Sequence, residues 1–136
     1  FGPTPRCQGH IPAASIIGAI YFWGKGVAID YPRAMAAYKG GAEGDDAGCQ
    51  YMVGMMYYKG YSVAVDYKQA RVWLEKAAAQ GVPMAVGTLG GMYHEGLGVT
   101  PSFRRARELF KRAIELGDSE SVESMQTLTQ IIQEVS

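Results

Sequence analysis

Hydrophobic and polar positions alternate with helical spacing along most of this chain. In the segment that begins at Tyr67, a tyrosine, a leucine and several alanines recur every three or four residues. This spacing places them on one face of a helix. Large side chains alternate with small ones on that face, which lets two helices approach closely and interlock. The same offsets recur from Tyr31 and from Phe103. The pattern therefore predicts several packed helices of one kind.

The recurrence extends to the whole chain, with a period of 36 residues. Shifting the sequence by 36, without insertion or deletion, places identical residues at five positions in all three copies. These are Gly18, Gly54 and Gly90; Tyr21, Tyr57 and Tyr93; Gly24, Gly60 and Gly96; Val27, Val63 and Val99; and Ala34, Ala70 and Ala106. A period of this length is typical of arrays in which stacked helical units bury one continuous core.

Each copy predicts two helices joined by a glycine-containing loop. The first helices are expected over residues 13–23, 49–59 and 85–95. A glycine follows each of them, at 24, 60 and 96, and ends the helix in a left-handed conformation. The second helices start after a side-chain oxygen that caps them, from Asp30, Asp66 and Ser102. Gly81 and Gly117 end second helices, and Asp45 stands at their offset in the first copy.

These elements predict one repeat domain over 13–136. Its repeats span 13–48, 49–84 and 85–120, and a capping helix follows over 119–135. That last helix is expected to turn inward an apolar stripe made of Leu128, Ile131, Ile132 and Val135. Residues 1–12 are expected to form an irregular tail, a remnant of a preceding repeat. The first residue is Phe1 and not Met, which is compatible with a segment of a longer chain or a larger complex.

The repeat resembles the Sel1-like repeats, which are relatives of tetratricopeptide repeats. The second copy carries the family pattern at Val53, Gly54, Tyr57, Gly60, Val63, Asp66, Ala70, Trp73, Leu74, Ala77, Ala78 and Gly81. It departs from the pattern at Cys49, where the family has alanine, and at Ser62, where it has glycine. The resemblance implies an all-α fold, a right-handed α-α superhelix. It also implies that partner proteins bind on the concave side. A secreted subgroup has regular cysteine pairs in each repeat, which this chain lacks.

Composition excludes several classes of function. Lys and Arg together number 13, as do Asp and Glu, so the net charge is zero. A nucleic-acid binder needs clustered positive charge, so we expect no such partner. No apolar run approaches the roughly 20 residues of a membrane-spanning helix. The two cysteines, Cys7 and Cys49, fit neither a disulfide framework nor a zinc site, and Cys49 is expected to be an inert core thiol.

No residue pattern predicts catalysis or a cofactor. His94 and Glu95 begin like a zinc-protease motif, but no second histidine follows. The glycine pairs at 24–26 and 96–98 do not continue as phosphate-binding loops and coincide with the repeat's own loop. Asp30 and Asp66 are equivalent caps one repeat apart, too far to share a proton. The sequence therefore predicts no enzyme, cofactor or metal, and it indicates no cellular compartment.

Basic side chains crowd the last second helix, at Arg104, Arg105, Arg107, Lys111 and Arg112. Glu108 lies four residues before Arg112, and Glu115 lies four residues after Lys111. One interpretation is a solvated outer face with ion pairs between successive turns. The other is a docking patch for an acidic partner segment.

The residues that the repeat does not dictate are the candidates for partner binding. The expected binding residues are Phe22, Trp23, Met55, Tyr58, Lys59, His94 and Glu95. Phe22, Tyr58 and His94 are equivalent positions and are expected to form a ladder across the solenoid surface. Methionines would add an adaptable apolar surface. The alternative is that Phe22 and Trp23 pack on a neighbouring repeat or on missing chain.

Two functions fit these observations. The first is a non-catalytic adaptor that binds a partner protein segment on its concave face, with Lys59, His94 and Glu95 providing specificity. The second is a structural domain packed inside a larger assembly, with no exchangeable ligand. An exposed apolar N-terminal end would favour the second.

Overall fold

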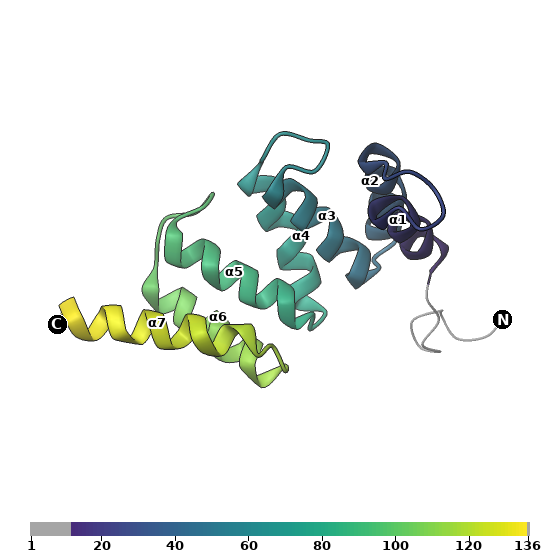
Figure 1. Cartoon of the computed structure of the whole chain (residues 1–136). Coiled ribbons are helices and arrows are strands. Elements are labelled where there is room, and N and C mark those ends of the chain that lie inside the picture. Colours follow the sequence, from purple (N-terminus) through teal and green to yellow (C-terminus); the bar gives the residue numbers. More distant parts are fainter. Residues whose placement is uncertain (1–11, 136) are drawn as a thin grey trace.

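The computed structural model describes residues 12–135, and Figure 1 shows them as a row of helices. All regular structure in this range is helical, which confirms the predicted fold class. The helices are α1 (Ala13–Trp23), α2 (Tyr31–Glu43), α3 (Ala47–Lys59), α4 (Tyr67–Ala79), α5 (Pro83–Glu95), α6 (Phe103–Glu115) and α7 (Glu120–Val135). The tail expected over residues 1–12 lies outside the described residues except for Pro12. The same holds for Cys7.

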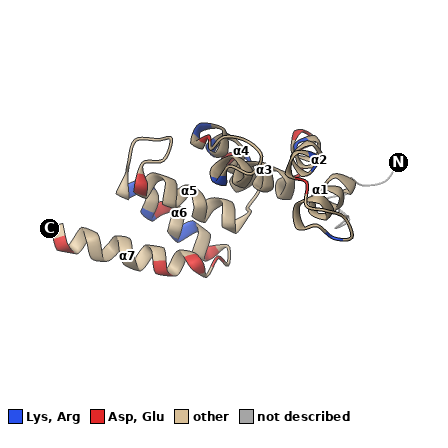
Figure 2. Cartoon of the chain, turned by 45° about the horizontal axis from the view of Figure 1, so that its top comes forward, with Lys and Arg blue, Asp and Glu red and all other residues tan. Residues whose placement is uncertain are grey.

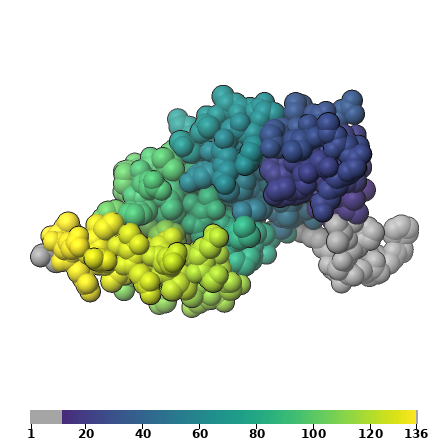
Figure 3. All heavy atoms as spheres, in the orientation of Figure 1, coloured from purple at the N-terminus to yellow at the C-terminus, as the bar shows by residue number. Residues whose placement is uncertain are grey.

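The helices form successive pairs, and each repeat contributes one pair. The molecule is elongated as a result, with α1 and α2 toward one end and α7 at the other (Figure 3). The helices α3 and α5 begin two residues before the predicted starts at 49 and 85. For α3 the reason is Asp46, whose carboxylate accepts a hydrogen bond from the Cys49 amide at 2.9 Å. Pro83 occupies the first turn of α5, where a missing amide hydrogen is tolerated.

The predicted caps and loop residues are confirmed. The side chains of Asp30, Asp66 and Ser102 accept hydrogen bonds from the amides three residues later, at 3.1, 3.1 and 3.2 Å. Asp45 has the left-handed φ of 73° that its offset predicts. Ser62, which replaces the second loop glycine of its repeat, also keeps a left-handed φ, of 62°. The left-handed loop conformation is therefore kept even where serine replaces the glycine.

Each repeat is held together by a glycine on its first helix that faces a large side chain on its second. A Cβ atom added at Gly18 would lie 2.6 Å from the Tyr38 ring. One added at Gly90 would lie 2.7 Å from the Phe110 ring. Leu74 takes the equivalent place opposite Gly54. These approaches confirm the predicted interlocking of small and large residues.

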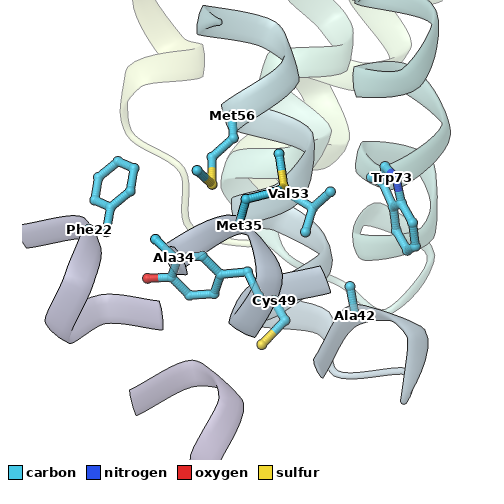
Figure 4. Packing of buried hydrophobic residues seen from close by; sticks show 9 residues of the cluster. Phe22, Ala34, Met35, Ala42, Cys49, Val53, Met56 and Trp73 are labelled. Carbon is cyan, nitrogen blue, oxygen red and sulfur yellow. The ribbon is translucent and has the colours of Figure 1, made fainter. Parts of the chain in front are cut away.

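The core of the first two repeats continues across their boundary. Figure 4 shows Phe22, Met35, Met56 and Trp73 in one cluster, so side chains from α1, α2, α3 and α4 pack together. Cys49 is fully buried in this cluster, as predicted. A Cβ atom added at Gly41 would lie only 2.5 Å from the Sγ atom of Cys49. Gly41 therefore permits the close approach of α3 to α2.

The last helix, α7, is only partly covered. Leu128 is fully buried and Ile131 and Ile132 are half-buried, as the apolar stripe predicts. Val135 belongs to the predicted stripe but is 77% exposed, which corrects the prediction at this position. It lies at the final residue of the helix, beyond the part of α7 that packs on the rest of the protein.

Candidate functional site

The first helices of the repeats line a surface groove. One part of it, a hollow of about 360 Å³, lies between the end of α1 and the faces of α3 and α5. Its walls are largely apolar, and they come from Phe22, Trp23, Tyr51, Met52, Met55, Lys59, Tyr61 and Met84. Trp23 is 62% exposed and Met84 is 52% exposed. Large apolar side chains are therefore available at the rim of this hollow.

A second hollow of about 370 Å³ adjoins the first and extends to α7. The two hollows share Tyr51, Met55, Lys59 and Met84. Beyond these shared residues the second hollow is more polar, because Thr88, Asp118, Glu120, Ser121 and Ser124 line it. We call the two hollows together the first-helix groove. It runs from α1 to α7 across all three repeats.

The structure brings together five of the seven expected binding residues. Trp23, Met55 and Lys59 line the groove, and Tyr58 lines its second hollow. Phe22 also lines it but is only 7% exposed. Its ring packs edge-on against Tyr61 at 5.2 Å between ring centroids. Phe22 thus belongs to the core, as the packing alternative predicts for it, whereas Trp23, the other residue of that alternative, is exposed.

Phe22, Tyr58 and His94, which are expected to form a ladder across the solenoid surface, each pack within their own repeat. Each ring contacts the aromatic ring nine residues later, at the start of the second helix. The centroid distances are 5.3 Å for Phe22 and Tyr31, 5.6 Å for Tyr58 and Tyr67, and 5.4 Å for His94 and Phe103. The ladder positions therefore join the first helix of each repeat to its second. His94 and Glu95 do not line the first-helix groove.

The end of the groove nearest α7 is acidic. Burial raises the pKa of Tyr51 above its ordinary value, and the negative charges of Glu120 and Asp118 raise it further. Burial also raises the pKa of Tyr58, with a further contribution from Glu95. Both phenols therefore remain protonated donors at neutral pH. Lys59, which lines both hollows, places a positive charge between the apolar and the acidic parts.

Sequence reasoning missed Tyr51 and Met84 as groove residues, although a signal was present. Tyr51, Met55 and Lys59 follow one another at intervals of four residues. This interval places them on one helix face. A comparison of equivalent repeat positions does not reveal this helix face, because the residues 36 positions after Tyr51 and Met55 are Gly87 and Gly91. These two glycines also line the second hollow, where they leave room beside α5.

Neither a metal site nor a reactive Cys49 thiol is found within residues 12–135. Within residues 12–135, no three His, Cys, Asp or Glu side chains gather closely enough to hold a metal ion. Burial raises the pKa of the Cys49 thiol to about 12, and the neighbouring Asp46 adds to this, so the thiol is unreactive at neutral pH. None of the helices in this range combines the length and the hydropathy needed to cross a membrane.

Comparison with known proteins agrees with the repeat architecture. The chain is 37% identical, with a TM-score of 0.79, to c5321, a protective antigen of uropathogenic Escherichia coli strains with an SLR fold. It is 30% identical, also with a TM-score of 0.79, to a Sel1 repeat protein from Oxalobacter formigenes. These matches cover 84% and 90% of this chain but only 24% and 50% of the two proteins. Cysteine-rich protein B of Helicobacter pylori shares the fold, at 21% identity over 70% of this chain and 71% of its own, with a TM-score of 0.65.

The family comparison gives the same result repeat by repeat. No curated protein matches the chain significantly. The model of the Sel1 repeat, in contrast, matches residues 11–39, 47–82 and 88–118, and so coincides with the three observed helix pairs. Proteins built from this repeat typically mediate protein–protein interactions and are generally non-catalytic scaffolds. The chain therefore belongs to the Sel1 repeat family.

Proposed function

We propose that this domain is a non-catalytic adaptor that binds a partner protein segment in the first-helix groove, on the concave side of the solenoid. The observation that carries the proposal is the continuity of the groove. Four shared residues join its two hollows into one surface across α1, α3, α5 and α7. A partner segment lying along it would contact all three repeats. Such a surface suits an extended peptide or a helix with several anchors.

The apolar part of the groove supplies the affinity in this proposal. Trp23 and Met84 are more than half exposed, although large apolar side chains are usually buried. Partly exposed aromatic side chains beside a hollow are typical anchors of protein interfaces. Met52, Met55 and Met84 add unbranched side chains that adapt to the shape of a partner.

The polar part supplies the specificity. Lys59 would pair with a carboxylate of the partner, and Asp118 and Glu120 would pair with a basic residue further along. We assign His94 and Glu95 to the edge of the binding surface. Glu95 is close enough to Tyr58 to raise its pKa, although it does not line the hollows.

A specific observation also favours a second function, that of a packing domain within a larger assembly. Ile16 and Ile17 on α1 are 49% and 46% exposed and lie outside the groove. Two adjacent exposed isoleucines provide an apolar contact surface at the N-terminal end of the solenoid. A neighbouring subunit could cover this surface without entering the groove.

Crosslinking mass spectrometry in the native extract distinguishes the two functions. The groove variant carries Trp23→Ser and Met84→Ser, and the matched control carries Ile16→Ser and Ile17→Ser; all four side chains are exposed, so both variants should fold. For an adaptor we expect one partner that crosslinks near Lys25 and Lys59 and is lost only in the groove variant. Loss of the partner only in the control variant would instead assign the domain to an assembly. Circular dichroism verifies the fold of both.

A further inference from the structure

The basic cluster of α6 is divided by the structure between two environments. The guanidinium of Arg105 stacks on the Tyr93 ring at 5.3 Å. Arg104, Arg107 and Lys111 instead line a hollow of about 600 Å³ between α6 and α7. The other lining residues are Phe103, Glu108, Met125 and Ile132. This α6–α7 hollow shares no residue with the first-helix groove.

In the preceding repeats, the equivalent site is covered by the loop of the next repeat. The Tyr61 ring lies 4.9 Å from the Tyr31 ring, and the backbone at Gly98 lies directly over Tyr67. Phe103 is the equivalent of Tyr31 and Tyr67, but it is 38% exposed. The reason is that α7 continues as a helix through Ile132, the position at which the earlier repeats have the loop glycine.

In the first repeat, the core beside this site also includes a side chain from the second helix of the next repeat. Met35 on α2 is only 9% exposed and belongs to the same cluster as Trp73 on α4 (Figure 4). Arg107 occupies the position of Met35 two repeats later, and it is exposed. The α6–α7 hollow thus lacks the cover that the earlier repeats have at this site, and Phe103, Met125 and Ile132 form its apolar floor.

The charges around the hollow are unbalanced toward positive. Arg104, Arg107 and Lys111 line it against a single carboxylate, that of Glu108. That carboxylate pairs with Arg104 at 3.7 Å, and not with Arg112 as the helical spacing predicts. Arg107 and Lys111 therefore remain to attract negative charge. The charged residues of α7 are all glutamates (Figure 2), but none of them lines the hollow, to which α7 contributes only Met125 and Ile132.

We propose that the α6–α7 hollow binds an amphipathic helix of a partner protein, apolar toward Phe103, Met125 and Ile132 and acidic along the edge that faces α6. Burial of the apolar floor provides the attraction, and the carboxylates of the partner pair with Arg107 and Lys111. The occupant would cover the site that the loop of the next repeat covers at Tyr31 and Tyr67. This site is separate from the first-helix groove, so an adaptor could hold two partner segments at once.

The test uses two synthetic peptides with the same leucine and alanine face. The first carries glutamates along one edge, and the second carries lysines at the same positions. Fluorescence anisotropy at low ionic strength measures their affinities, and amide chemical shifts locate the site. We expect the glutamate peptide to bind about tenfold or more tightly than the lysine peptide. The amide shifts should fall on residues 103–111 and 125–132.

Two matched variants test the role of the charges. Arg107→Glu with Lys111→Glu should weaken the glutamate peptide about tenfold. Lys25→Glu with Lys68→Glu makes the same change in net charge away from the hollow and should leave binding nearly unchanged. All four side chains are exposed, so folding should be preserved in both variants.

Several results would overturn the proposal. These are equal binding of the two peptides, absence of binding by either, an equal effect of the two variants, and shifts confined to the first-helix groove. Analytical ultracentrifugation tests whether a second copy of this chain occupies the hollow instead. A dimer that Ile132→Asp dissociates would show that a second copy of this chain fills the hollow, and the proposal would again fail.

Discussion

Replacing Gly90 with alanine tests whether the approach of each first helix to its second limits stability. The added Cβ would stand 2.7 Å from two carbon atoms of the Phe110 ring and 3.2 Å from a third. Phe110 is 2% exposed, so its ring has little room to move away. The neighbouring residue, Gly91, offers a matched control. It lies on the same helix, and a Cβ there would meet nothing within 4 Å.

The two substitutions share one energy term and differ in another. Each replaces a helical glycine with alanine, which stabilises a helix by about 1 kcal/mol. Only Gly90→Ala also forces extra volume into a packed core, at a cost of about 1–3 kcal/mol. The helix term cancels in the comparison. The free energy of unfolding of Gly90→Ala should therefore be about 1–3 kcal/mol lower than that of Gly91→Ala.

Thermal unfolding monitored by circular dichroism measures this difference. For a domain of this size, 1 kcal/mol corresponds to about 3–5 °C in Tm. We expect Gly91→Ala to melt slightly above the wild type and Gly90→Ala clearly below Gly91→Ala. Adding Phe110→Leu to Gly90→Ala should recover part of the gap, because a smaller side chain relieves the contact. Equal melting temperatures for the two alanine variants would refute the packing argument.

Three further predictions concern a cap, a buried thiol and a polar contact within the second repeat. Asp66→Ala should lower the free energy of unfolding in urea by about 1 kcal/mol, and Asp66→Asn should be nearly neutral because it keeps the acceptor oxygen; equal losses would contradict the cap. The pKa of Cys49 is raised to about 12, so its contribution to stability should be complete below its ordinary pKa and lost as the pH rises from about 9 to 12. Urea unfolding curves between about pH 9 and 12 measure this loss of stability, which should be smaller in Cys49→Ala than in the parent when both carry Cys7→Ser. Gln80→Ala should cost about 1–3 kcal/mol, because it removes the donor 3.0 Å from the Oε1 atom of Gln50, which is 2% exposed. Replacing Gln50 with valine, the residue found 36 positions later, should reduce that loss, and an unchanged loss would contradict the contact.

Most of the fold could be predicted because its determinants are local and recur. A helix ends at Gly24, Gly60 or Gly96 and begins after Asp30, Asp66 or Ser102 through contacts within a few residues. Three copies in phase make such local signals unambiguous. The pairing of Gly90 with Phe110 could also be inferred, since small and large residues alternate at fixed offsets.

The binding surfaces were only partly predictable, because they depend on which helices become neighbours. Repeat equivalence suggested that Phe22 and His94 share a surface, but the tertiary structure turns each toward an aromatic ring nine residues later. The groove instead follows Tyr51, Met55 and Lys59, which share a face of α3 without being repeat-equivalent to one another. The apolar side chains of α7 that lie beside part of the basic cluster of α6 likewise become its neighbours only in the tertiary structure.

The sequence by itself therefore determined the repeat, its helices and the side chains that hold each pair together, since all of these act within one copy. The tertiary structure decided which side chains stay accessible. Trp23 is exposed while Phe22 beside it is buried, because burial depends on the neighbouring helices and loops as well as on the residue type.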